Sequence, residues 1–289
     1  MVVIAVDCGG TNLTVAHADR AGSPRGSTTI RTPPTADDIT EAILDLMAQF
    51  PTADRVGVGI AGLVDHADGR LISMPHRPGS SRIADIIRAR SGLPTLVDND
   101  ANTAGLAEAT GGAGVGHRVV FTMTVGTGIG GGLTIDGKVE RGRAHLGEVG
   151  HMSIDPEGPR CVCGAVGCWE EIASGRALDR AATAVGLPDG VALVAAARSG
   201  DHRAAGMVAE VGTAFGRGLA NLAAIIDPDV FVVGGGVSAV GDLFLEPARR
   251  SLAISLFAGD SRMPPPLLKA GFGPAAGIVG AALMAGAPL

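Results

Sequence analysis

Aromatic residues are scarce in this chain of 289 residues, which has no tyrosine, seven phenylalanines and a single tryptophan, Trp169. An aromatic platform on which single-stranded nucleic acid could stack is therefore implausible. Positive charge is also in deficit, because 29 acidic and 23 basic residues give a formal net charge of −6. The basic footprint that DNA binding needs is missing, and we expect no nucleic-acid partner.

Long apolar runs and export signals are missing as well. The longest stretch of small apolar residues, 275–288, falls short of the roughly 20 residues that cross a bilayer and contains glycines, so we expect a packed C-terminal helix. The apolar run at residues 2–6 is short and has no basic flank. These features predict a cytoplasmic protein with no membrane partner, and a chain of this length needs no disulfide staples.

Glycine, by contrast, is abundant, with 45 residues that recur at two similar places. A β-branched run at residues 2–6 enters the turn Asp7-Cys-Gly-Gly-Thr-Asn, and a strand resumes at Leu13. Much later, residues 119–125 enter a glycine run at 126–132, and a strand resumes at Leu133. The offset of 120 residues places Gly10 on Gly130 and predicts a duplicated unit built on a glycine-turn hairpin.

Strands and helices alternate through the rest of the chain, which predicts α/β sheets. We expect helices at residues 36–50, 81–90, 102–109, 177–185, 191–197, 203–226 and 243–256, and strands at 55–60, 95–97, 230–233 and 267–269. No long linker interrupts this pattern, so two lobes that meet at a cleft are expected.

The first glycine turn suits a phosphate group. Asp7 stands at a strand end, and the backbone N–H groups of Gly9 and Gly10 can approach phosphate oxygens while Asp7 orients a metal-bound water. The alternative is an ordinary tight hairpin turn.

The second turn contains the spacing G-x-G-x-x-G at Gly126, Gly128 and Gly131, which in a nicotinamide dehydrogenase would be followed by a helix. A strand is expected there instead. The pattern therefore favours a second phosphate-binding hairpin.

A polar cluster at residues 98–102 lies between an expected strand and an expected helix, at the strand edge where α/β proteins bind ligands. Capping of the helix by Asp100 or Asn102 is the simpler interpretation, but one cap accounts for only one of the polar side chains. Asp100 is the candidate base for a hydroxyl that attacks a phosphoryl group.

One histidine and three cysteines, His151, Cys161, Cys163 and Cys168, fall within eighteen residues. This ligand set suits a tetrahedral structural Zn²⁺ with no open position, and disulfides or free thiols are the alternatives. Zinc on one nitrogen of His151 would direct its other nitrogen toward a ligand, with Glu148 and Glu170 close by in sequence. Cys8 stands apart and is expected to be a small buried residue.

Together these motifs resemble the ROK family (repressors, open reading frames and kinases) of the sugar-kinase, Hsp70 and actin superfamily. The resemblance runs through essentially the whole chain and rests on residues 7–11, 99–100, 126–132, 147–151 and 161–170. It implies an α/β, two-lobed actin-like ATPase (ribonuclease H-like) fold, with a duplicated domain and a central cleft. The expected lobes are residues 1–108 plus 275–289, and residues 109–274.

The resemblance also implies an activity, an ATP-dependent hexose kinase of the glucokinase kind, working in glycolysis as a homodimer. Asp100 would be the base, and the sugar would contact Asn99, Asp100, Glu148, His151 and Glu170. Zinc would be held by His151, Cys161, Cys163 and Cys168. ATP and Mg²⁺ would bind at Asp7, Gly9, Gly10, Thr11, Asn12, Gly126, Thr127, Gly128 and Gly130, with the adenosine at Gly234, Gly235 and Gly236.

Some features leave alternatives open. The family often has Pro-Asn where this chain has Pro75-His76 followed by Arg77, and residues 151–159 look like those of N-acetylmannosamine kinases. N-acetylmannosamine, N-acetylglucosamine or another hexose is thus an alternative to glucose, and polyphosphate an alternative to ATP. A sugar-sensing regulator without catalysis is the alternative of another class, although the hairpin at Asp7 leaves no expected room for an upstream DNA-reading domain.

Overall fold

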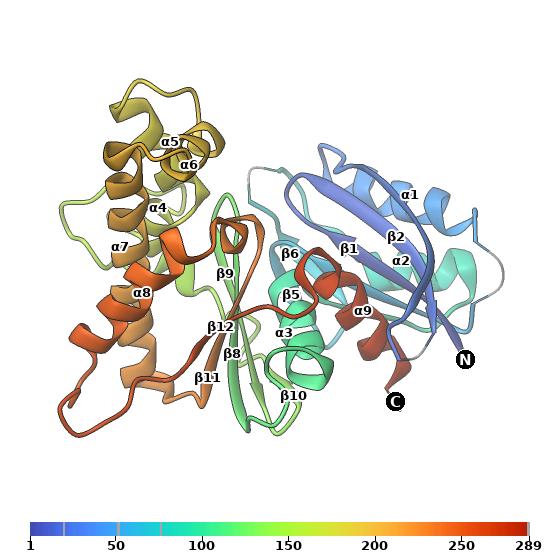
Figure 1. The fold of residues 1–289 in the computed structure, drawn as a ribbon. Helices are drawn as coiled ribbons and strands as arrows, with labels where there is room; N and C mark the ends of the chain where they lie inside the picture. The colour runs from blue at the N-terminus through green and yellow to red at the C-terminus, as the bar shows by residue number, and fades with distance from the viewer. Residues whose placement is uncertain (20, 51–52, 76, 288–289) are drawn as a thin grey trace. The chain divides into compact units, whose positions relative to one another are not determined.

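Two five-stranded sheets with the same plan form the framework of the chain in this computed structural model (Figure 1). The structure describes residues 1–19, 21–50, 53–75 and 77–287. In spatial order the first sheet contains β3 (Pro24–Arg31), β2 (Asn12–Asp19), β1 (Val2–Cys8), β4 (Arg55–Ile60) and β7 (Thr95–Asn99). The second contains β10 (Lys138–Glu140), β9 (Ile129–Ile135), β8 (Val119–Val125), β11 (Val230–Gly234) and β12 (Leu267–Lys269).

The pairing directions repeat as well. In the first sheet β1–β2 and β2–β3 are antiparallel, whereas β1–β4 and β4–β7 are parallel. In the second sheet β9–β10 is antiparallel, whereas β8–β11 and β11–β12 are parallel. The glycine turns join equivalent strands, β1 to β2 and β8 to β9, as the offset between the two hairpins predicts.

The contacts divide the chain into two compact units. The first comprises Met1–Val115, Gly132–Leu146 and Gly271–Leu289, and the second comprises Gly116–Gly131 and Gly147–Ala270. The expected second lobe also contained residues 109–115, 271–274 and 132–146, which belong to the first unit. The longest of these segments, residues 132–146, packs with α3 (Asp100–Gly111). The backbones approach closely there, because a Cβ on Gly132 would lie 2.5 Å from the carbonyl oxygen of Ala101 in this helix.

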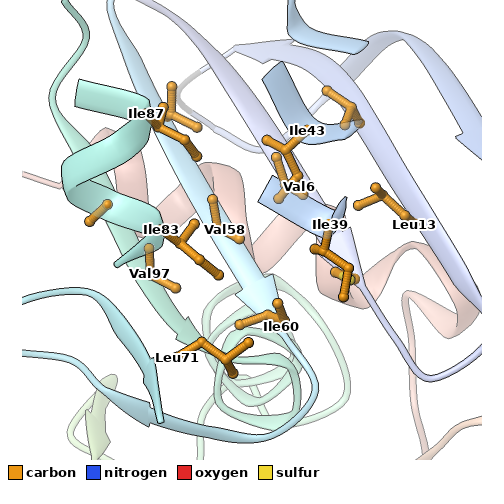
Figure 2. Packing of buried hydrophobic residues seen from close by; sticks show 14 of the residues in the cluster. Val6, Leu13, Ile39, Ile43, Val58, Ile60, Leu71, Ile83, Ile87 and Val97 are labelled. Carbon is orange, nitrogen blue, oxygen red and sulfur yellow. The ribbon is translucent and has the colours of Figure 1, made fainter. Parts of the chain in front are cut away.

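In the first unit, helices cover both faces of the sheet because successive strand residues point to opposite sides. Ile4 and Val6 face the side covered by α1 (Ala36–Met47) and α2 (Ile83–Ser91). Figure 2 shows this core, in which Ile39, Ile43, Ile83 and Ile87 from the helices pack with Val6, Val58 and Val97 from the strands. A small hairpin of β5 (Leu63–Asp65) and β6 (Arg70–Ser73) adds Leu71 to this core.

The opposite face is covered by α9 (Ala276–Gly286), which packs with the small side chains of Val3 and Ala5. Here the backbones themselves come together. A Cβ on Gly57 would lie 2.0 Å from the carbonyl oxygen of Ala281, and one on Gly280 would lie 1.7 Å from that of Thr103. The C-terminal apolar run is therefore a packed helix, as expected, although Pro288 lies outside the described residues.

The second unit carries α4 (Trp169–Ala173), α5 (Gly175–Ala184), α6 (Gly190–Arg198), α7 (His202–Ile226) and α8 (Asp242–Ser255). Its remaining short helices are 3₁₀ turns, η1 (Val149–His151) and η2 (Gly236–Val240). Glycines again allow close approach, since a Cβ on Gly216 of α7 would lie 2.3 Å from the carbonyl oxygen of Ala248 in α8. Within the described part of the chain, no helix combines the length and apolar character of a bilayer-spanning segment.

The expected elements are present, and the structure adds strands and a short helix that the sequence pattern did not indicate. The most instructive addition is β3, whose sequence Pro-Arg-Gly-Ser-Thr-Thr-Ile-Arg is polar and largely exposed. It occupies a sheet edge and pairs only with β2. An edge strand with little burial shows no apolar alternation from which a strand can be read.

The close packing of α9 on the sheet generates a stability prediction. Gly57→Ala places a methyl group against the backbone of Ala281, and overpacking of this kind lowers the free energy of unfolding by about 1–3 kcal/mol. Gly206→Ala is the matched control, because nothing lies within 4 Å of a Cβ at this helical glycine. Thermal melts should show a lower Tm for Gly57→Ala and an unchanged or raised Tm for Gly206→Ala. Equal melting temperatures for the two variants would contradict the packing described here.

Candidate active site and metal centre

The carbonyl groups of the first glycine turn, between β1 and β2, are held by residues outside the hairpin. Thr32 Oγ1 donates to the carbonyl of Gly9 at 2.8 Å, and the Thr32 backbone N–H donates to that of Thr11 at 2.9 Å. Arg77 Nη2 donates to the carbonyl of Gly10 at 2.8 Å, while its Nε donates to that of Pro33 at 2.8 Å. These bonds set the peptide orientation of the turn.

Arg77 and Thr32 are the functional neighbours that sequence reasoning missed at this turn. Arg77 follows the departure from the family pattern at Pro75-His76, and this departure gives no indication of a bond to the turn, 67 residues away in sequence. Its neighbour in that departure, His76, lies outside the described residues. At the turn itself, a Cβ on Gly10 would meet nothing within 4 Å, so there is open space next to the backbone where a phosphate group is expected.

Asp7 and Cys8 end β1 beside this turn. Burial raises the pKa of Asp7 to about 6. The Asp7 carboxylate lies against the start of α9, where a Cβ on Gly277 would be 2.4 Å from Asp7 Cγ, so only glycine fits at position 277. Burial, and to a smaller extent the negative charges of Asp7 and Asp100, raise the pKa of the Cys8 thiol to about 12. Cys8 is thus a buried, protonated thiol, and both carboxylates lie within electrostatic reach of it.

Asp100 begins α3, at the end of β7, and is half-buried. The helix is capped by Asn99 and not by Asp100 or Asn102: Asn99 Oδ1 accepts from the backbone N–H groups of Ala101 at 2.8 Å and Asn102 at 3.3 Å. Asn99 Nδ2 donates to the carbonyl of Gly62 at 3.0 Å. The side chain of Asn99 therefore has a structural task in addition to its expected sugar contact.

Asp98, the remaining acidic residue of the polar cluster, supports this segment from within the protein. Its Oδ1 accepts from the backbone N–H of Asn99 and from Asn102 Nδ2, each at 2.8 Å. Its Oδ2 accepts from Arg141 Nε at 2.7 Å. Asp98 is buried, and the Arg141 charge compensates it. Sequence reasoning did not indicate Arg141, because 43 residues separate the two partners.

The carbonyl groups of the second glycine turn also accept hydrogen bonds from residues outside the hairpin. The Gly126 carbonyl accepts from the backbone N–H of Gly175 at 2.8 Å. The Thr127 carbonyl accepts from Ser174 Oγ at 2.8 Å and from Arg176 Nε at 3.1 Å. The strand β9 follows this turn, as expected, which removes the structural basis of a nicotinamide dehydrogenase.

The third glycine segment, after β11, lies beside the second hairpin. Gly235 has a φ of +80°, and its Cβ would be 2.4 Å from the carbonyl oxygen of Val125 at the end of β8. Gly236, which begins η2, has open space around its Cβ position. The candidate adenosine-binding segment and the candidate phosphate hairpin are therefore neighbours within the second unit.

His151, Cys161, Cys163 and Cys168 come together in the second unit, with ligand atoms within 4.8 Å of one another. His151 Nδ1 lies 3.6 Å from Cys161 Sγ, and Cys163 Sγ lies 3.5 Å from Cys168 Sγ. Ligands of one tetrahedral ion, bound at about 2.3 Å by sulfur and about 2.0 Å by nitrogen, are separated by roughly 3.5–3.8 Å. The four side chains can thus hold one tetrahedral ion.

The protonation of the cysteines differs across this cluster. The backbone N–H of Ala165 stabilises the Cys163 thiolate and lowers its pKa, whereas burial raises the pKa of Cys168 to about 12. Burial also raises the pKa of Cys161. A bound metal ion would have to displace these protons, because it binds thiolates.

His151 presents its two nitrogens to different groups. Nδ1 faces the cysteine cluster and lies 3.5 Å from Glu170 Oε1, while Nε2 lies 3.9 Å from Glu148 Oε2. The structure thus brings Glu148, His151 and Glu170 together in the second unit, beside the cluster that can hold a metal. Asn99 and Asp100 belong to the first unit.

Comparison with known proteins places the chain among sugar kinases along its whole length. A protein-family model described as "ROK family" matches residues 3–287. The glucokinase of Streptomyces coelicolor is 37% identical over 99% of this chain and 98% of its own length. The N-acetylmannosamine kinase of Escherichia coli strain SE11 is 33% identical, with 99% and 98% covered.

A solved structure agrees with these sequence matches. The crystal structure of a ROK family glucokinase from Streptomyces griseus in complex with glucose and AMPPNP is 38% identical, has a TM-score of 0.89 and is matched over 99% of both chains. This match confirms the predicted fold class, an α/β fold of the actin-like ATPase type.

The raised pKa of Asp7 predicts how stability depends on pH in the magnesium-free protein. The folded state resists ionisation of Asp7 up to about pH 6, whereas the unfolded chain ionises it near pH 3.8. The contribution of protonated Asp7 to the free energy of unfolding is therefore fully present below the pKa of the unfolded chain, 3.8. It is lost as the pH rises through the folded-state pKa of about 6, which lowers the free energy of unfolding by up to about 3 kcal/mol. Urea denaturation between about pH 4 and pH 7 should show wild type losing free energy of unfolding relative to Asp7→Asn. Parallel pH profiles for the two proteins would contradict this prediction.

Proposed function

This chain belongs to the ROK family, and on that premise we propose that it is an ATP-dependent kinase that phosphorylates the 6-hydroxyl of a hexose, with glucose as the first candidate. The observation that carries the proposal is the full-length similarity to the Streptomyces griseus glucokinase that holds glucose and AMPPNP. The residues support it, because both glycine turns, the aspartate at the start of α3 and the group of Glu148, His151 and Glu170 are all present.

The reaction assigned to these residues is a direct phosphoryl transfer. The Asp100 carboxylate accepts the proton of the 6-hydroxyl while that oxygen forms a bond to the γ-phosphorus. The bond between the γ-phosphorus and the oxygen bridging to the β-phosphate breaks, and ADP leaves. Asn99, Glu148, His151 and Glu170 orient the sugar through its other hydroxyls, which keeps the 6-hydroxyl in line with the phosphoryl group.

The nucleotide is assigned to the glycine segments. The phosphates are assigned to Gly9, Gly10, Thr11 and Asn12 in one turn and to Gly126, Thr127, Gly128 and Gly130 in the other. The N–H groups of Gly9 and Gly126 donate within the turns, to the carbonyls of Asn12 and Gly128 at 3.0 Å each, so these two residues shape the turns while backbone N–H groups such as those of Gly10 and Thr127 bind phosphate. Gly234, Gly235 and Gly236 pack against the adenosine. Asp7 would hold Mg²⁺ through water, and this ion would offset the negative charge of the phosphates. A cation beside Asp7 would favour the ionised form of its carboxyl and would oppose the effect of burial, which raises its pKa to about 6.

We assign the Cys₃His cluster to structural Zn²⁺. Three thiolates and an imidazole are the ligand set that zinc prefers, and four protein ligands leave no position for a reacting water. Zinc on Nδ1 of His151 would leave Nε2, which lies 3.9 Å from Glu148 Oε2, to contact the sugar. A homodimer, a cytoplasmic location and a role in glycolysis remain predictions.

The kinase assignment predicts sugar-dependent ADP release that requires Asp100. Coupled assays with glucose, mannose, N-acetylglucosamine, N-acetylmannosamine, fructose and allose should identify the substrate, and Asp100→Asn should lower kcat by on the order of 10²–10⁴ with little change in KM. Asp136→Asn is the matched control, because Asp136 is exposed in the β9–β10 turn at a φ of 51°, which asparagine also adopts. Zinc-containing, folded protein without turnover on any sugar would instead support a sugar-sensing regulator.

The donor is tested in the same assay with polyphosphate in place of ATP. A bulky residue at position 235 is a poor probe of adenosine binding, because a side chain there would meet the backbone of Val125 at 2.4 Å. Gly236→Leu is the better variant, since the space around this position is open. It should raise the KM for ATP and leave turnover of a phosphate-only donor unchanged.

The zinc assignment predicts about one zinc per chain in protein purified without added metal. Cys163→Ala removes one ligand and should abolish stoichiometric zinc, whereas Cys8→Ala, which alters the cysteine outside the cluster, should retain it. Elemental analysis by mass spectrometry measures both. Zinc-free wild type, or equal zinc in the two variants, would overturn the ligand assignment.

A further inference from the structure

Arg176, the second residue of α5, contacts both the candidate phosphate hairpin and a candidate sugar ligand. Its Nε donates to the carbonyl of Thr127 at 3.1 Å, and its Nη2 lies 3.6 Å from Glu170 Oε2. Its Nη1 lies 3.1 Å from Glu171 Oε1. One guanidinium thus joins the backbone of the hairpin to the carboxylate expected to bind sugar.

The surrounding packing makes this connection tight. Ser174, which is fully buried, donates from Oγ to the same Thr127 carbonyl at 2.8 Å. On the other side, a Cβ on Gly128 would lie 2.3 Å from Glu170 Oε2, so the hairpin backbone passes directly beside this carboxylate. A displacement of Glu170 in such a close-packed region is felt by the hairpin.

The connection depends most on Arg176, because its charge compensates two buried carboxylates. Glu170 and Glu171 are 6% and 5% exposed, and buried carboxylates of this kind depend on a paired cation. Arg176 pairs with both Glu170 and Glu171, whereas Arg180 pairs with Glu171, at 3.1 Å, and not with Glu170. A sugar hydroxyl that donates to Glu170 competes with Arg176 Nη2 for the same carboxylate. Because the guanidinium is planar and rigid, a shift at Nη2 moves Nε relative to the Thr127 carbonyl.

We propose that Arg176 is a positioning residue that couples sugar binding at Glu170 to the conformation of the second phosphate hairpin. Sugar and nucleotide then bind cooperatively. The inference rests on the proposed kinase function, because it takes Glu170 as a sugar ligand and the turn at Thr127 as a phosphate ligand. All of these contacts lie within the second unit.

The test measures the coupling between the two ligands. Isothermal titration calorimetry gives the affinity for AMPPNP with and without a saturating concentration of glucose, or of the sugar that the substrate assay identifies. The ratio of the two affinities is the coupling factor, which in coupled sites is typically about 5–150. Arg176→Gln should reduce this factor at least about fivefold, toward one, because glutamine cannot bridge Glu170 and the Thr127 carbonyl.

Two further variants separate positioning from a merely structural role. Arg180→Gln removes a cation from the same helix and the same Glu171 but leaves the bridge intact, so its coupling factor should match wild type. Arg176→Lys keeps the charge that compensates the buried carboxylates but lacks the rigid fork, and it should also lose coupling. If Arg176→Gln melts at a much lower temperature than wild type, Arg176→Lys decides the outcome.

The results distinguish this inference from the function on which it rests. A wild-type chain that phosphorylates no sugar overturns the proposed function. A wild-type chain that phosphorylates sugar but has a coupling factor near one overturns the inference alone. The inference alone is also overturned if Arg176→Lys retains full coupling, or if Arg180→Gln loses as much coupling as Arg176→Gln.

Discussion

Anchoring of the glycine-turn carbonyls is the interaction on which the candidate site depends. A glycine turn can adopt many backbone conformations, and only some of them direct N–H groups at a ligand. In the first turn Thr32 and Arg77 hold the carbonyl oxygens, and in the second Ser174, Gly175 and Arg176 do so. Each peptide group is thereby oriented before any phosphate arrives, which reduces the ordering that binding requires.

The same anchoring connects the second glycine turn to other residues of the candidate site. Ser174, Gly175 and Arg176 follow directly after α4, the helix that carries Glu170, and α4 follows directly after the cysteines of the Cys₃His cluster. One continuous segment therefore contributes three cysteines of the Cys₃His cluster, presents the carboxylate of Glu170 and orients the second glycine turn. In the first unit, Asp98 plays a comparable supporting part, because its two oxygens position Asn99 and Arg141 while Asp100 begins the helix.

Glycine at points of backbone contact is the other requirement of this fold. Gly57, Gly280 and Gly216 lie where a methyl group would meet a neighbouring carbonyl, and Gly277 lies where it would meet the carboxylate of Asp7. The high glycine content thus reflects particular helix–sheet and helix–helix contacts as well as the two glycine turns. Close approach of α9 also explains why the strand residues beneath it are as small as Ala5.

Periodicity and ligand spacing are local properties, so the alternation of strands and helices, the repeated hairpin, the Cys₃His cluster and the aspartate at the end of β7 could all be predicted from the sequence. Contacts formed on folding establish that Asn99 caps α3, that β3 is an edge strand and that residues 132–146 pack with the first unit. Folding also determines the partners of Arg77, Arg141 and Arg176. A long cationic side chain reaches partners tens of residues away in sequence, and no local pattern encodes which carbonyl or carboxylate folding will bring beside it.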